Sequence, residues 1–541
     1  MHLNYKEIPG YPKIFLDYIY DYEKVSHLYK KYFRNKDEYL SHFKKIIDNY
    51  SKRNFDLHGI VSKQYSDFTP SEITQNNIDK LKSKKTLTVV TGQQLGILGG
   101  PLYTIYKTLT AIKLCKVLSE RYNDFNFVPV FWLEGDDHDF NEVNSIGILN
   151  LENEFKAIKY GENISNDDDR ISVGKLKFNE DINIFFDEIK SSIRETEFTE
   201  GLLNNLKDYY RPNNSFKESF KKLIFSLFDK YGLIVFDPQE NSSKEILKPI
   251  FKKEINDFRT NTEKVIKVSA DLEETYHAQI KVKPVNLFYS DDEGRYLIEP
   301  TDTGFRLKGK RTKFTKDELL SLIENSPEKF SPNVLLRPIC QDYIFPTAFY
   351  VGGPSEIAYF AQLLPMYKLF NLEEPILYPR KSVTLIENNI NKTIGKFKLD
   401  IKDVFIEKYE LEEKIISLLS GDNTDEIFKK VKDEFEITFD KLKDKLFEID
   451  KTLSDVSSKS QDKILRYLDE LKNKTDNAVK RKNETSVNQI NKISSALYPS
   501  SNLQERELNF IYFENKYGKE ILDNIYSELD IDNYEHQLIM L

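Results

Sequence analysis

The hydrophobic positions between residues 86 and 144 follow the alternation of an α/β sheet. A β-branched run at 87–90 predicts a buried parallel strand, and the apolar run at 127–133 predicts the next one. Between them, apolar residues recur at helical spacing from Ile105 to Leu118. Strand, glycine-rich loop, helix and strand in this order are typical of one half of a nucleotide-binding sheet.

Similar runs recur further along the chain and predict the rest of the sheet. Residues 232–237 are expected to form a buried strand that rejoins it, and 334–338, 345–351 and 376–380 are expected to add three more strands. A helix is expected over 355–370. The fold class that we predict is therefore α/β with a Rossmann-like core.

The remaining segments predict helices and two inserts. Helical stripes fill residues 14–84, short apolar runs at 145–185 suit an antiparallel sheet, and 244–270 is helical. A turn signal at 291–294 predicts a hairpin. The expected domains are 1–144 for the N-terminal helices and first half of the core, 145–230 for the first insert, 231–332 for the return to the core and second insert, 333–395 for the second half of the core, 396–500 for a coiled coil and 501–541 for a docking segment.

The coiled coil is expected because apolar residues alternate by threes and fours. The seam runs through Phe439, Leu442, Leu446, Ile449, Leu453 and Val456. The step from Val456 to Ile464 breaks this rhythm, so the chain is expected to turn back or fray at 454–460. The apolar C-terminal residues are expected to dock.

Length, charge and cysteine content argue against some classes of function but do not identify one. A chain of 541 residues is expected to form two to four domains, and its net charge of −9 gives no argument for nucleic-acid or membrane binding. Two cysteines cannot make a disulfide framework, so a reducing cytoplasm is expected. No signal peptide or membrane span is apparent.

The triplet Gly-Gly-Pro occurs at 99–101 and at 352–354, each time ahead of an expected helix. Two helix N-termini at the carboxyl edge of one sheet would favour a phosphate or carboxylate there. In the first copy Lys107 could neutralise phosphate oxygens, although it could also be an ordinary solvated lysine. The loop matches neither the Walker nor the Rossmann glycine pattern. The candidate residues of this half-site are Gly92, Gln93, Gln94, Gly100, Tyr103, Thr104 and Lys107.

Polar residues after other strands complete the candidate site. The run Asp136, Asp137, His138 and Asp139 could hold Mg²⁺ with substrate phosphates, or a substrate amine or hydroxyls; zinc is unlikely because no spaced ligand set is visible. Cys340 is interpreted as a packed thiol. Glu356 could equally be a plain helix cap. The candidates in the second half are Arg337, Gln341, Asp342, Gly353, Glu356, Tyr359 and Arg380.

Several long motifs resemble one known family, the bacillithiol-synthesis cysteine ligases called BshC. They are VVTGQQLGILGGPLYTIYK, VPVFWLEGDDHDFNEVN, LLRPICQDYIFPTAFYVGGPSEIAYFAQL, LYPRKSVTLIE, SALYPSSNLQERELNF and the final HQLIML. The resemblance covers essentially the whole chain. It implies a Rossmann-like core related to class I aminoacyl-tRNA synthetases, two connecting inserts, and a C-terminal coiled coil that forms a homodimer.

The resemblance also implies a reaction, the addition of L-cysteine to the amine of glucosaminyl-malate. By analogy it would use ATP, with Thr104, Lys107, Asp137 and His138 as the catalytic candidates. A nucleotide-binding coiled-coil scaffold and a ligase for a different amino-sugar or thiol acceptor are the alternatives.

Overall fold

The computed structural model describes residues 1–161, 170–420 and 424–541. They form two compact units. The first comprises Met1–Leu385 with Gln504–Ile539, and the second comprises Ile386–Leu503 with Met540–Leu541.

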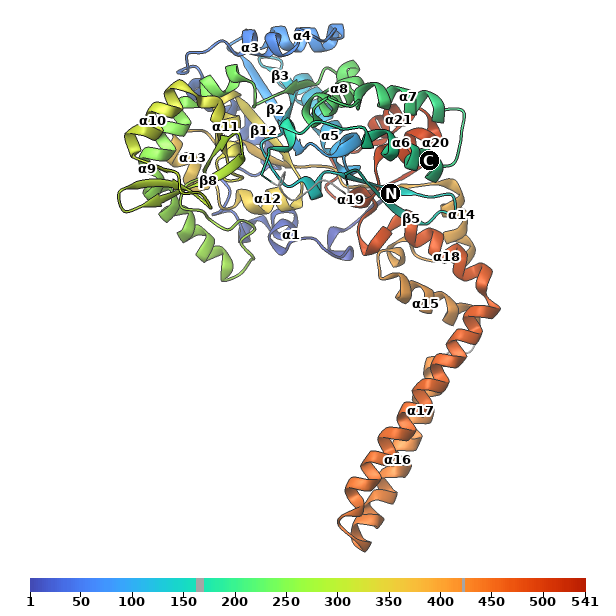
Figure 1. Ribbon diagram of the computed structural model, residues 1–541. Helices are drawn as coiled ribbons and strands as arrows, with labels where there is room; N and C mark the ends of the chain where they lie inside the picture. The colour runs from blue at the N-terminus through green and yellow to red at the C-terminus, as the bar shows by residue number, and fades with distance from the viewer. Residues whose placement is uncertain (162–169, 421–423) are drawn as a thin grey trace. The chain divides into compact units, whose positions relative to one another are not determined.

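A parallel five-stranded sheet lies at the centre of the first unit (Figure 1). Numbered by their order in the chain, its strands lie in the spatial order 3-2-1-4-5, and this order reverses between β2 and β12. The α/β Rossmann-like prediction is confirmed. In spatial order the strands are β6 (Ile234–Phe236), β3 (Asn126–Glu134), β2 (Thr86–Gln94), β12 (Thr347–Gly352) and β13 (Ile376–Pro379).

Apolar residues make this sheet a buried layer, as its continuous hydrophobic runs predict. Helix α5 (Tyr103–Arg121) packs against β2 and β3, and α2 (Tyr39–Tyr50) packs against β2 and β12. Phe43 of α2 lies edge-on to Phe127 and Phe349 from the two halves of the sheet, with ring centroids 5.3 and 6.0 Å away. The expected N-terminal helices are present as α1 (Lys13–Tyr20), α2, α3 (Leu57–Gln64) and α4 (Glu72–Lys80).

Two inserts interrupt the core. The first begins with an antiparallel pair, β4 (Ser145–Leu149) and β5 (Phe155–Lys159), and continues as α6 (Asp181–Ser192), α7 (Thr199–Tyr209) and α8 (Phe216–Phe228). The second follows α9 (Asn241–Glu273) and contains the predicted hairpin, in which Asp291 pairs with Gly294. Its antiparallel sheet contains β7 (Leu287–Asp291), β8 (Gly294–Thr301), β9 (Gly304–Leu307), β10 (Lys313–Phe314) and β11 (Phe330–Pro332), and α10 (Lys316–Asn325) lies between β10 and β11.

Two predicted elements of the second half are wrong. Residues 334–338 are not a strand, because the Asn333 side chain accepts hydrogen bonds from the Leu335 and Leu336 amides, both at 3.0 Å, and α11 (Arg337–Ile344) begins there. The helix expected over 355–370 is two helices, α12 (Pro354–Phe360) and α13 (Leu364–Phe370). Pro365 stands in the first turn of α13, where a proline is tolerated.

The C-terminal segment returns to the first unit. It forms α19 (Gln504–Glu507), α20 (Phe510–Tyr517), α21 (Glu520–Glu528) and β15 (His536–Met540). Strand β15 lies between β1 (His2–Leu3) and β14 (Val383–Ile386). Glu505 forms a buried ion pair with Arg380, with 2.8 Å between the charged atoms, and also accepts a hydrogen bond from the Val383 amide.

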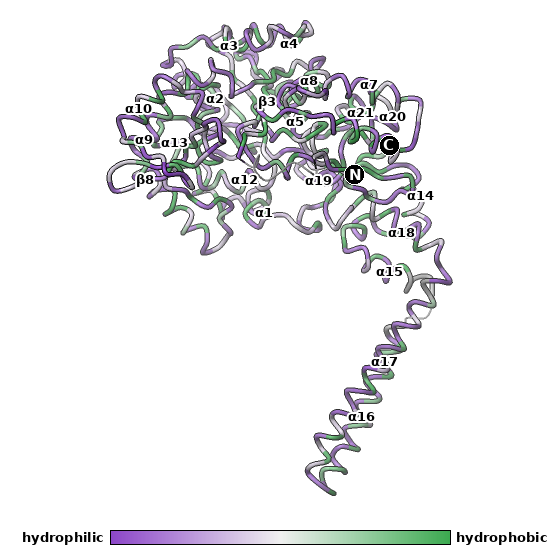
Figure 2. The backbone as a smooth tube through the Cα atoms, viewed as in Figure 1, coloured by the Kyte–Doolittle hydropathy of each residue, from purple (hydrophilic) through white to green (hydrophobic). Residues whose placement is uncertain are grey.

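The second unit is helical. Figure 1 shows its long helices α16 (Thr424–Ile449) and α17 (Leu453–Lys482) side by side, and Figure 2 shows apolar and polar residues alternating along both. The chain does reverse, but at 450–452, where the Asp450 carboxylate accepts a hydrogen bond from the Thr452 amide; residues 454–460 are helical. The other helices are α14 (Asn388–Phe397), α15 (Lys408–Ser420) and α18 (Glu484–Leu497). Among the described residues, no helix is long and apolar enough to cross a membrane.

Substituting Glu505→Gln should lower the free energy of unfolding by about 3–5 kcal/mol, because the buried Arg380 guanidinium would lose its counter-charge. Urea unfolding measures this loss. Asp187→Asn, at an exposed ion pair with Lys207, is the control and should change stability little. Equal effects of the two substitutions would contradict a stabilising role for the buried pair.

Candidate functional site

A cleft of about 640 Å³ lies where the strand order of the parallel sheet reverses. This is the edge at which open α/β sheets bind ligands. The carboxyl ends of β2 and β3, the start of α11, the start of α12 and the second insert all contribute side chains. The principal polar residues of its lining are Gln93, Gln94, Glu134, Asp137, His138, Glu142, Lys281, Lys283, Arg295, Asn333, Arg337, Ser355, Glu356 and Tyr359.

The acidic residues of the cleft come mainly from β3 and the loop after it. The Gln94 side-chain amide donates hydrogen bonds to Asp137 at 2.6 Å and to Glu142 at 2.7 Å. His138 lies 3.5 Å from the Asp137 carboxylate and 3.4 Å from a guanidinium nitrogen of Arg295. The predicted contribution of this loop to the cleft thus rests on Asp137 and His138.

The cationic residues come from α11 and the second insert. Arg337 donates a hydrogen bond to the Tyr359 hydroxyl at 2.7 Å. The Arg295 guanidinium lies 3.7 Å from the Phe288 ring centroid and donates to Ser331 and to the Pro332 carbonyl, both at 2.8 Å. These contacts hold both guanidinium groups in fixed positions.

Glu134, the last residue of β3, is a cleft residue that the sequence analysis did not single out. Its carboxylate lies 3.3 Å from Arg337 Nε. Burial raises the pKa of Glu134 to about 7, although the positive charge of Arg337 opposes this shift. Its position directly after the apolar run at 127–133 was the available signal, since such a residue emerges at the carboxyl edge of the sheet.

Lys107 of α5 and Glu356 of α12 meet at this edge. Lys107 is buried, with 1% of its side chain exposed; it forms an ion pair with Glu356 and donates a 2.6 Å hydrogen bond to the Gly92 carbonyl. Glu356 also accepts a hydrogen bond from the Gly353 amide at 2.8 Å. Lys107 therefore lies beneath the cleft lining, as a tie between β2 and α12, rather than as the solvated lysine that was the alternative.

The first Gly-Gly-Pro loop does not open into the cleft, because the C-terminal segment covers it. The Asn509 side chain donates to the carbonyls of Leu98 and Gly100, at 3.0 and 2.7 Å, and the Leu102 amide donates to the Leu508 carbonyl. Thr104 is fully buried behind this contact. A Cβ atom at Gly96 would lie 2.7 Å from the Gly100 Cα, so the glycines serve close packing of the loop on itself.

Three further candidates, Tyr103, Asp136 and Asp139, do not line the cleft. Asp136 forms a buried ion pair with Lys244 at 2.9 Å, and Asp139 caps a short 3₁₀ turn by accepting from the Glu142 amide. Tyr103 accepts a 3.3 Å hydrogen bond from Gln93. Within the described residues, no three His, Cys, Asp or Glu side chains gather as metal ligands do.

Gln341 and Asp342 do not follow a strand as predicted, because that segment is α11. Gln341 accepts a hydrogen bond from Arg337, and Asp342 accepts one from the buried Tyr367 hydroxyl. Burial raises the pKa of Asp342 to about 6. Arg380 is buried against Glu505, and Cys340 is a buried free thiol. None of these four residues lines the cleft.

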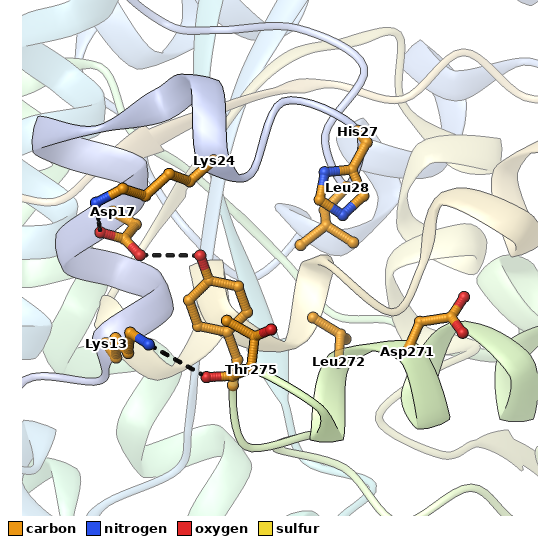
Figure 3. A pocket seen from close by; sticks show the side chains of 9 residues that line it. Lys13, Asp17, Lys24, His27, Leu28, Asp271, Leu272 and Thr275 are labelled. Carbon is orange, nitrogen blue, oxygen red and sulfur yellow. Dashed lines mark hydrogen bonds and ion pairs between the residues drawn. The ribbon is translucent and has the colours of Figure 1, made fainter.

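A second hollow, of about 360 Å³, lies between α1 and the end of α9 (Figure 3). Several of its polar groups are paired with one another: Asp17 accepts a hydrogen bond from Tyr276 at 2.9 Å and lies 3.5 Å from the Lys24 ammonium, and Lys13 donates to the Thr275 carbonyl. None of the predicted site residues lines it. The cleft at the sheet reversal is therefore the candidate site.

The parallel sheet has the strand order 3-2-1-4-5, and a charged cleft lies where this order reverses. Both features are typical of Rossmann-like proteins that bind a ligand at this edge of the sheet. The chain belongs to the bacillithiol biosynthesis BshC family. The model of the family's N-terminal Rossmann-like domain matches residues 1–381, and that of its C-terminal coiled-coil domain matches residues 383–541.

Relatives match the chain over nearly their whole length. A protein from Chloroherpeton thalassium is 34% identical over 98% of this chain and 97% of its own, and one from Salinibacter ruber is 32% identical over 98% and 96%. A third, from Chlorobaculum tepidum, is 32% identical over 98% and 97%. All three carry the name "Putative cysteine ligase BshC", which places the family among ligases.

Substituting Lys107→Met should reduce the free energy of unfolding by about 3–5 kcal/mol, because the partly buried Glu356 carboxylate would lose its partner. Denaturant unfolding monitors the loss, and the exposed Lys116→Met in the same helix is the matched control. The double variant Lys107→Met with Glu356→Gln should lose less than the sum of the two single losses. Wild-type stability of Lys107→Met would rule out the tie between β2 and α12.

Proposed function

We propose that this protein joins the carboxyl group of L-cysteine to the amino group of glucosaminyl-malate in bacillithiol synthesis, using ATP to activate the carboxylate. One observation carries the proposal. In a chain that matches the family over its full length, carboxylates face arginines and lysines across a cleft at the reversal point of the sheet.

The charges of the cleft suit these substrates. Cysteine brings an ammonium and a carboxylate, and the acceptor brings an amine and the two carboxylates of its malate part. Lys281, Lys283 and Arg295 all line the cleft and offer positive charges for the malate carboxylates. Asp137 and Glu142 offer negative charge for a substrate ammonium. A cleft of this size holds such ligands without large rearrangement.

ATP would supply the energy for a bond between a carboxylate and an amine. The cleft lining offers the Gln93 amide, the Ser355 hydroxyl and the cationic side chains as donors for its phosphates. Lys107 cannot reach those phosphates without breaking its ion pair with Glu356. In this proposal Mg²⁺ enters bound to the nucleotide phosphates rather than in a preformed protein site.

The purified protein mixed with ATP, L-cysteine and glucosaminyl-malate should form a product whose mass equals the two substrates less one water. Mass spectrometry detects it, and the reaction without ATP is the control. Nucleotide binding with no product would instead favour the scaffold, and product with another amine would favour a different acceptor.

The same assay can test whether the cleft recognises the negative charge of the acceptor's malate part. Glucosaminyl-malate should react faster than a neutral glucosamine glycoside, and the double variant Lys281→Met and Lys283→Met should reduce that preference several-fold, because two favourable charges would be lost. Lys313→Met, on the outer strand β10, is the matched control. An unchanged preference in the double variant would remove these lysines from acceptor binding.

We also propose that α16 and α17 form the interface of a homodimer. Their apolar side chains remain exposed in a single chain, which a second copy would cover. The most exposed of them include Ile437, Leu442, Phe447, Ile449, Val456, Tyr467 and Leu471.

Light scattering should give twice the single-chain mass of 63.6 kDa. The double variant Leu442→Glu and Leu471→Glu should shift the protein to a monomer, because two exposed apolar side chains that the second copy would bury would become charged. Ile184→Glu, an exposed apolar residue of α6, is the control and should leave the dimer intact. A monomeric wild-type protein would refute the interface.

A further inference from the structure

One carboxylate in the cleft, that of Glu134, has a buried oxygen for which the described part of the chain supplies no hydrogen-bond donor. Glu134 Oε2 is buried, yet it accepts no hydrogen bond from the described residues, and the nearby Arg337 Nε faces it at 3.3 Å only as an ion pair. The side chain is 21% exposed and lines the cleft. A buried acceptor without a donor costs free energy, so the carboxylate gains from taking up a proton, and its exposed part is where a proton from the substrate would arrive.

The other carboxylates of the cleft are already engaged. Asp137 and Glu142 accept hydrogen bonds from Gln94, and Glu356 is held by Lys107 and the Gly353 amide. Asp136, in the adjoining loop, is paired with Lys244. Of these groups Glu134 has the most capacity left to take up a proton.

The surroundings of Glu134 set its affinity for that proton. Burial raises its pKa to about 7, the Arg337 charge opposes the shift, and the neighbouring carboxylates add to it. At neutral pH the group can therefore both accept and release a proton, as a general base must. The charged and titratable groups around it are Arg337 and Cys340 of α11, Arg295 of β8, Tyr359 of α12, and Asp136 and Asp137 of its own loop.

We propose that Glu134 is the general base that takes the proton from the acceptor's amino nitrogen as the new amide bond forms. This inference rests on the proposed ligase reaction. The nitrogen lone pair forms the C–N bond to the activated carbonyl carbon of cysteine, and one N–H proton passes to the Glu134 carboxylate. The C–O bond to the phosphate-containing leaving group breaks, and the leaving group keeps its electron pair. Glu134 then releases the proton to water in the cleft.

The near-isosteric Glu134→Gln tests this role, with Glu514→Gln, at a mostly buried carboxylate of α20, as the matched control. At pH 7 we expect Glu134→Gln to lower kcat about 100-fold or more, with little change in KM for either substrate. Glu514→Gln should behave as the wild type.

The pH profile separates a base from a structural residue. Below pH 6.5 the wild-type kcat/KM for the acceptor should fall with a slope approaching two, because both the amine and Glu134 must be unprotonated. In Glu134→Gln only the amine titrates, so the slope should be one. Glu134→Asp should recover part of the rate and the steeper slope.

Three outcomes would overturn the assignment, each for a different reason. A Glu134→Gln variant with near wild-type kcat and slope two would show that the proton goes elsewhere. A raised KM with unchanged kcat and slope would show that Glu134 only anchors the acceptor. A wild-type protein that forms no product would defeat the proposed ligase function itself, and the base would fall with it.

Discussion

The buried ion pair between Lys107 and Glu356 is the constraint on which the site depends. An ammonium without solvent costs several kcal/mol unless its partners are in place, so α5 and α12 must bring these two side chains together. The Gly92 carbonyl and the Gly353 amide complete the arrangement, and they stand at the ends of the two strands between which the sheet order reverses. The pair thereby fixes the floor of the cleft.

Much of the fold could be predicted because buried strands and helices leave local patterns of apolar residues in the sequence. Buried parallel strands require continuous apolar runs, and those at 87–90, 127–133 and 376–380 are strands of the central sheet. The run at 334–338 has similar composition but follows Asn333, whose side chain binds the next amides and starts α11. A short apolar run cannot by itself separate a strand from a helix start, so this local polar contact decided the outcome.

The site was harder to predict because its geometry depends on distant contacts. Two Gly-Gly-Pro helix starts at one ligand site were expected, but the C-terminal segment covers the first, and Lys107 lies beneath the cleft lining. Helical spacing does not reveal which face of a helix is covered. Asn509, some four hundred residues further along the chain, closes the first loop. Glu134 was not predicted because the acidic run after it gave the stronger sequence signal. The properties that single out Glu134 are its raised pKa and its position beside Arg337, and both depend on burial. The roles of the candidates that line the cleft stay predictions.

The placement of the C-terminal segment has a consequence for biosynthesis. Asn509 seals the loop between β2 and α5, and β15 separates β1 from β14. A nascent chain that has emerged from the ribosome only as far as β13 therefore has all five strands of the central sheet but lacks the segment that closes its glycine loop. The first unit can be completed only after the long helices α16 and α17 have been translated. Until then its glycine loop remains uncovered, and chaperones would have this exposed surface to bind.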